Sequence, residues 1–172
     1  MDHDAQRRPG PGPHPSSGPG PGDLIADALG ILLRRGTRVD LHRALTAGMG
    51  EAVDELTYPV LSGLARSGPR SAADLAPEIG LDRSGVTRRA SRLEEAGLVR
   101  RAPDPADRRA TLLALTPDGE RAVAELRARL SAHIETSLAS WAPGEAAAFA
   151  HHLRRFVADG PFSFSRPPGE GA

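Results

Sequence analysis

The chain has 172 residues, 39% of them hydrophobic and 3% aromatic, which is enough for one compact domain with tails. Its 22 basic residues, all Arg, balance 22 acidic ones, so the overall charge does not predict a nucleic-acid partner. The absence of Cys excludes disulfides and Cys-based zinc sites, and the lack of a long apolar run or a secretion signal predicts a cytoplasmic protein without membrane contact.

Residues 1–22 are mostly Pro, Gly and Ser, with almost nothing apolar to bury, and they are expected to form a disordered tail. Asp23 is a plausible N-cap for a helix whose apolar residues recur at near-helical spacing to about Thr46. Gly30 and Gly36 weaken this pattern, so a kink is expected near Gly36. The segment 48–55 fits either a turn or a short helical extension.

Three further helices are predicted before residue 97. Thr57 is expected to cap the first, and Ser71 has the right spacing to an acidic residue to begin the second. Gly80 makes the turn after this short helix. Asp82 caps the third helix, and Gly97 occupies its C-cap position.

The two sides of the third helix differ in character. Helical periodicity places Val86, Ala90, Leu93 and Gly97 on one side, which is predicted to face the core. The opposite side carries Ser84, Arg88, Ser91 and Arg92, with Arg83 before them and Gly85, Thr87 and Arg89 flanking. Arginine pairs bidentately with guanine edges and phosphates, and small residues permit close approach to DNA. We interpret these eight residues as candidate DNA contacts.

A hairpin with a basic tip follows this helix. Residues 98–102 and 110–115 are predicted as its strands, and the loop between them contains Asp107, Arg108 and Arg109. Adjacent arginines at the tip of a hairpin suit contacts with a neighbouring minor groove or its phosphates. Helix, turn, helix and hairpin together predict a winged helix-turn-helix, which we call the head.

The charge is distributed unevenly along the chain. Between Arg83 and Arg109 there are eight arginines and four acidic residues, a net charge of +4, which the rest of the chain balances. A basic head on an acidic remainder is typical of a duplex-binding protein.

Two more helices are predicted beyond the hairpin. Thr116 and Pro117 have the residue types of an N-cap and a first helical position. An apolar stripe continues this helix through Val123, Leu126, Leu130, Ile134 and Leu138. A last helix is expected over 145–158. Because the first helix and the striped helix are too long for one small head to cover, we expect a two-fold homodimer.

The stretch LDRSGVTRRASRLEEAGLVRRAPDPADRRATLLALTPDGE resembles the multiple-antibiotic-resistance regulator (MarR) family of winged-helix transcription factors. The resemblance covers roughly residues 23–158. It implies a mainly α fold with a small β-wing, in which terminal helices of two subunits intertwine and each subunit presents one DNA-binding head. Many members are repressors that small phenolic or anionic ligands release from DNA.

By position, the resemblance places Ser84, Thr87, Arg88 and Arg89 at the major groove and Arg109 in the minor groove, with Asp107 bracing the wing. Three positions depart from the family pattern: Gly85 replaces a usual hydroxyl-bearing residue, Ser91 a common Asp, and Val60 a frequent Gln. The implied organisation is a tail (1–22), an N-terminal dimerisation helix region (23–56), a winged helix-turn-helix DNA-binding domain (57–116), C-terminal dimerisation helices (117–158) and a flexible tail (159–172).

Other functions are less well supported by the residues. Arg38, His42, Tyr58 and Trp141 are candidates for binding a small aromatic or anionic effector, although each also has an ordinary structural role. No metal-binding or catalytic motif is present, so neither a cofactor nor an enzymatic activity is expected. The alternative to a DNA-binding repressor is a winged-helix module that docks another protein.

Overall fold

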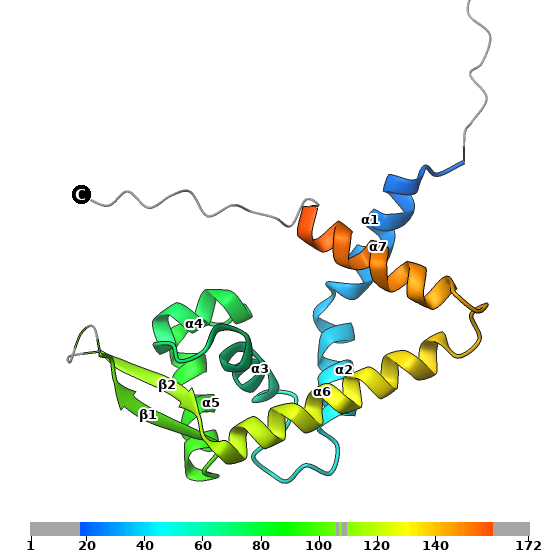
Figure 1. The fold of residues 1–172 in the computed structure, drawn as a ribbon. Coiled ribbons are helices and arrows are strands. Elements are labelled where there is room, and N and C mark those ends of the chain that lie inside the picture. The colour runs from blue at the N-terminus through cyan, green and yellow to red at the C-terminus, as the bar shows by residue number, and fades with distance from the viewer. Residues whose placement is uncertain (1–17, 106, 108–109, 160–172) are drawn as a thin grey trace, which may run out of the picture. The chain divides into compact units, whose positions relative to one another are not determined.

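The computed structural model describes residues 18–105, 107 and 110–159. Most of the two predicted tails, together with Arg108 and Arg109 at the predicted wing tip, lie outside the described residues. The described chain is mainly α with one small hairpin, as the sequence predicted (Figure 1). Its elements are α1 (Pro21–Leu32), α2 (Arg35–Thr46), α3 (Tyr58–Ser67), α4 (Ala72–Ile79), α5 (Arg83–Glu95), β1 (Val99–Pro103), β2 (Thr111–Leu115), α6 (Pro117–Leu138) and α7 (Glu145–Asp159).

The chain divides into two compact units between Tyr58 and Pro59. In the first unit, the single helix expected from Asp23 is two helices. The α1 helix begins at Pro21, two residues before the predicted N-cap, because the carboxylate of Asp23 accepts the backbone N–H of Gly20, 2.9 Å away. The break lies at Leu33 and Arg34, close to the kink predicted near Gly36, and Gly36 itself lies in the first turn of α2.

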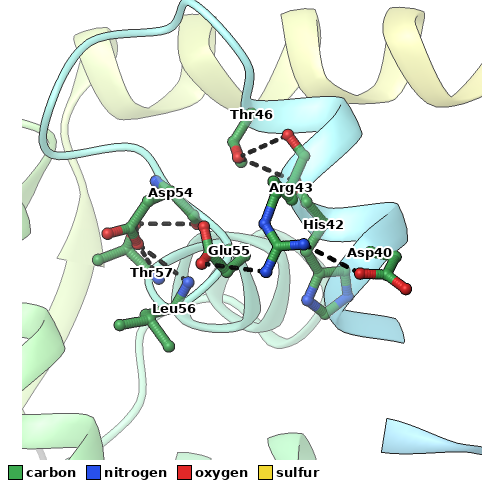
Figure 2. A network of polar contacts seen from close by, with 8 residues as sticks. All are labelled: Asp40, His42, Arg43, Thr46, Asp54, Glu55, Leu56 and Thr57. Carbon is green, nitrogen blue, oxygen red and sulfur yellow. Dashed lines mark hydrogen bonds and ion pairs between the residues drawn. The ribbon is translucent and has the colours of Figure 1, made fainter. Parts of the chain in front are cut away.

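The segment between α2 and α3 is a series of turns, which resolves the alternative left open for residues 48–55. A compact network closes these turns (Figure 2). Asp54 Oδ1 accepts the backbone N–H groups of Leu56 and Thr57 at 2.9 and 2.8 Å. The buried Thr57 hydroxyl donates to the carbonyl of Ala52 at 2.8 Å and accepts from the N–H of Asp54 at 3.0 Å. Thr57 precedes α3 as predicted, but its hydroxyl bonds to the turn before it.

The second unit has a core to which α3, α4, α5, α6 and the hairpin contribute. The buried apolar residues are Val60, Leu61 and Leu64 of α3, Leu75 and Ala76 of α4, Val86, Ala90 and Leu93 of α5, Val99 of β1, Leu113 and Ala114 of β2, and Val123 and Leu126 of α6. The predicted core side of α5 is therefore confirmed at three of its four positions. Gly97 is exposed, because it lies beyond the end of α5 with φ +72°, a left-handed conformation that turns the chain toward β1.

The hairpin pairs β1 and β2 antiparallel, from Val99 opposite Leu115 to Pro103 opposite Thr111. Each strand begins one residue later than predicted. The N–H of Leu98 is used to close the end of α5 on Leu93 O, 2.8 Å away, and the N–H of Ala110 is used in a loop turn. A feature that the sequence did not predict is a backbone bridge from Arg70 to Leu113, which adds a third extended segment to the hairpin.

The α6 helix begins as predicted, with Thr116 as N-cap and Pro117 in the first turn. Its first half is anchored in the core, whereas Ile134 in its second half is 47% exposed. The α7 helix has no buried residue, and Phe149, Leu153 and Val157 are all largely exposed. No helix in the described part of the chain is long and apolar enough to cross a membrane.

Candidate nucleic-acid interface

The α5 helix presents polar side chains to solvent from a backbone that is fixed on its other side. Ser84, Thr87 and Arg88 are exposed, and Val86, Ala90 and Leu93 anchor the same helix in the core. The hairpin β1–β2 lies beside α5 in the second unit (Figure 1). A helix that is rigidly held and polar outside is the arrangement by which a winged helix enters a major groove.

Asp82 fixes the beginning of this helix. Its Oδ1 atom accepts the N–H of Gly85 at 2.5 Å and the hydroxyl of Ser84 at 3.0 Å. The hydrogen bond from Gly85, and to a lesser extent the one from Ser84, holds the pKa of the Asp82 carboxyl below its ordinary value. The charges of Arg88 and Arg89 lower this pKa further. The carboxylate form is thus the one that organises the first turn of α5.

This cap makes the stability of the head depend on pH. Because the folded-state pKa of Asp82 is lowered, its stabilising contribution is present above the ordinary carboxyl pKa and is lost as the pH falls through the lowered value. Asn also caps helices but does not titrate, so the Asp82→Asn variant should melt below the wild type at pH 7. We expect the difference in melting temperature to shrink as the pH approaches about 3. A difference that stays constant from pH 7 to 3 would contradict this role.

Gly85 and Arg89, predicted to flank the contact face, are turned inward. Gly85 is buried, and a Cβ atom there would lie 2.8 Å from Arg89 Nη1 and 2.9 Å from Asp82 Oδ1. The absence of a side chain lets Arg89 fold back along α5, where Nη1 donates to the carbonyl of Gly85 at 3.0 Å. Arg89 Nε is buried without a hydrogen-bond partner among the described residues. Arg89 in this conformation does not extend from the exposed face.

Two other predicted contacts are also less accessible than expected. Ser91 and Arg92 are partly buried, and the hydroxyl of Ser91 accepts a hydrogen bond from Arg101 Nη2 at 3.1 Å. Arg83 at the start of α5 is exposed. The face that the structure leaves open therefore centres on Ser84, Thr87 and Arg88.

The base of the wing is ordered by its own backbone. Asp104 N–H donates to Ala110 O at 3.0 Å, and Ala110 N–H donates to the carbonyl of Asp107 at 2.8 Å. Asp107 is exposed. Arg100 and Arg101 of β1 were not among the residues predicted to contact DNA. Strand alternation could have separated them, because the burial of Val99 places Arg101 on the inner face and Arg100 on the outer face.

The predicted effector residues divide between the two units. His42 and Tyr58 stack in the first unit, with ring centroids 4.3 Å apart and planes tilted by 33°. Burial lowers the pKa of His42; a hydrogen bond with the backbone of Glu55 opposes this shift, and the charge of Arg38 adds to it. Trp141 belongs to the second unit, where it packs on Phe149 with centroids 5.3 Å apart.

Trp141 also contributes to a shallow, open pocket of the second unit. Its other lining residues are Ser140, Glu145 and Ala148. In the ranges that the structure describes, no cluster of three or more His, Asp or Glu side chains is placed to hold a metal ion.

Comparison with known proteins agrees with this geometry. Residues 53–110 match the sequence profile of the MarR family. The chain is similar to the HTH-type transcriptional regulator YxaD of Bacillus subtilis, with 30% identity over 77% of this chain and 90% of the relative. It is 35% identical to a putative transcriptional regulatory protein for the hcr operon of Thauera aromatica over 59% of this chain, which spans 62% of that relative's length.

Solved structures show the same fold. Rv1404 from Mycobacterium tuberculosis is similar at 28% identity with a TM-score of 0.65, over 82% of this chain and 95% of that one. The PcaV transcriptional regulator of Streptomyces coelicolor, solved with its natural ligand, is similar at 29% identity and a TM-score of 0.50, over 81% and 92% of the two chains. The chain belongs to the MarR family of winged-helix, DNA-binding transcriptional regulators.

Proposed function

We propose that this protein is a sequence-specific repressor that binds a pseudo-palindromic operator as a homodimer and is released by a small effector. The observation that carries the proposal is the exposed set Ser84, Thr87 and Arg88 on a helix whose opposite side is buried. A guanidinium and two hydroxyls on one helix face match the donors and acceptors of base edges and phosphates in a major groove. A repressor of this kind acts by occupying DNA that transcription requires.

Exposed apolar side chains support the homodimer. Leu24, Ile25, Ile31 and Leu32 on α1, and Phe149, Leu153 and Val157 on α7, are each more than 40% exposed in the isolated chain. So much apolar surface on two amphipathic helices is typical of an interface with another copy. A dimer would place its two heads about one helical turn, roughly 34 Å, apart on DNA. A monomeric mass in light scattering at micromolar concentration would contradict this.

Selection of bound duplexes from a random library tests the central proposal. We expect a recovered motif with two-fold symmetry and half-sites one helical turn apart. Recovery of no motif, together with little salt-sensitive binding to random duplex DNA, would indicate a protein-docking module instead.

The stacked pair His42 and Tyr58 is the proposed effector site. A partly buried imidazole on an aromatic ring, with Arg38 one turn away, offers stacking and charge to an aromatic acid. The similarity to PcaV, which was solved with its natural ligand, supports an effector of some kind.

We expect an aromatic acid from a panel of such compounds to raise the melting temperature and to release the operator. Replacing His42 with Gln should weaken both effects at least several-fold, because the ring that stacks on Tyr58 is lost. Replacing the exposed His133 with Gln is the matched control and should change neither effect. If no compound affects melting or DNA release, the effector proposal fails while the DNA-binding proposal stands.

A further inference from the structure

Arg101 joins the wing to α5, which we call the reading helix, through a forked contact. Its Nε donates to Glu94 Oε2 at 2.8 Å, and its Nη2 donates to Ser91 Oγ at 3.1 Å. Ser91 and Glu94 lie one turn apart on the same side of α5, whereas Arg101 lies on β1. The guanidinium thus spans two points along the helix axis from a single point on the strand.

A forked contact of this kind restrains orientation more than it contributes to stability. The guanidinium is planar, so two donors bound to two separate acceptors leave it little freedom to rotate. The side chains of Arg101 and Glu94 are 38% and 39% exposed, so solvent screens their attraction and the pair adds little to the stability of the fold.

The neighbouring arginine on the strand is placed differently. Val99 is buried, and side chains alternate along a strand, so Arg101 shares the inner face of β1 with Val99 while Arg100 lies on the outer face. The side chain of Arg100 is exposed and makes no hydrogen bond or ion pair with any residue that the structure describes, whereas its backbone pairs with Ala114 of β2. The two adjacent arginines therefore have different roles available: one is bound within the head, and the other is open to a phosphate.

We propose that Arg101 is a positioning residue that sets the angle between the wing and α5, and so makes this protein select DNA by the spacing of its major-groove and flanking contacts. The inference rests on the proposed DNA-binding function and assigns Arg101 no contact with DNA. Without the fork, the wing can adjust to any duplex, and discrimination between a matched site and other sequences is lost.

The test uses two substitutions that remove the same charge from adjacent positions. Full-length wild type, Arg101→Met and Arg100→Met are titrated with the selected operator and with a random duplex at several salt concentrations. For Arg101→Met we expect about tenfold weaker operator binding, unchanged binding to random duplex and an unchanged salt slope. For Arg100→Met we expect both duplexes to bind more weakly, with a slope smaller by about one per lost phosphate contact.

Two further variants separate orientation from charge. Arg101→Lys keeps the charge but lacks the fork, so it should lose discrimination as Arg101→Met does. The double substitution Ser91→Ala with Glu94→Gln should reproduce the effect of Arg101→Met, and adding Arg101→Met to it should cause no further loss. Thermal melting of each variant checks that the fold is retained.

Several outcomes overturn the inference. A smaller salt slope with Arg101→Met, rescued by Arg101→Lys, identifies Arg101 as a phosphate contact. Undiminished discrimination in Arg101→Met shows that the fork does not control specificity. A wild-type protein that fails to distinguish the operator from random duplex removes the proposed function itself, an outcome recognisable before any variant is compared.

Discussion

Replacing Gly119 with Ala is expected to lower the free energy of unfolding by about 3 kcal/mol. A Cβ atom at this position would lie 2.0 Å from the carbonyl oxygen of Leu98 and 3.3 Å from Leu115 Cδ2. The nearest atom belongs to the backbone, so a change of rotamer does not relieve the clash. The first turn of α6 has to move away from the base of the wing instead.

That movement would also break the cap of α6. The hydroxyl of Thr116 accepts the N–H of Gly119 at 3.1 Å and donates to the carbonyl of Gly97 at 2.6 Å, and the N–H of Thr116 donates to Leu98 O at 3.1 Å. These bonds tie the beginning of α6 to the end of α5. The loss of a helix cap typically costs about 1 kcal/mol.

Chemical denaturation at a fixed protein concentration measures the effect. The control is Gly36→Ala, where a Cβ atom would meet nothing within 4 Å and the residue lies in the first turn of α2. The gain in helix propensity should leave that variant at least as stable as the wild type. If Gly119→Ala were equally stable, the close approach of α6 to Leu98 would be wrong.

Replacing Arg88 with Ala is expected to remove most sequence-specific DNA binding without unfolding the protein. Arg88 is exposed on the open face of α5, between core residues that hold the helix in place. A bidentate arginine contact with a guanine contributes about 1–3 kcal/mol per subunit, so a dimer should lose roughly 10²–10⁴-fold in operator affinity.

Arg127→Ala provides a control with the same change in charge. Arg127 is exposed on α6, outside the reading helix and the wing. Titration of both variants with the selected operator and with a random duplex should show a loss of discrimination for Arg88→Ala alone. Equal operator affinities for the two variants would exclude Arg88 from base recognition.

Local sequence signals were sufficient to predict the reading helix. Asp82 and Gly97 are residue types suited to the two ends of a helix, and Val86, Ala90 and Leu93 recur at its period. These signals depend on neighbours within a few residues, so they act in the same way in almost any tertiary context. For the same reason, Thr116 and Pro117 correctly predicted the beginning of α6.

Local signals could not predict which side chains of α5 are free to contact DNA. Helical periodicity places Ser91 outward, but it does not reveal that Arg101, ten residues later on a strand, donates to its hydroxyl. Nor does it indicate that Arg89 folds back over the space left by Gly85. Both contacts depend on the packing of one particular side chain against another.

The sequence by itself determined which segments are helices, where most of them begin, and that a basic helix and hairpin form the head. These properties follow from caps, turns and periodicity, which are local. Only the tertiary structure decided that Ser84, Thr87 and Arg88 form the open face, while Arg89 folds back on the carbonyl of Gly85 and Arg101 is bound to Glu94. The physical reason is that each guanidinium has several possible partners, and packing between elements selects among them.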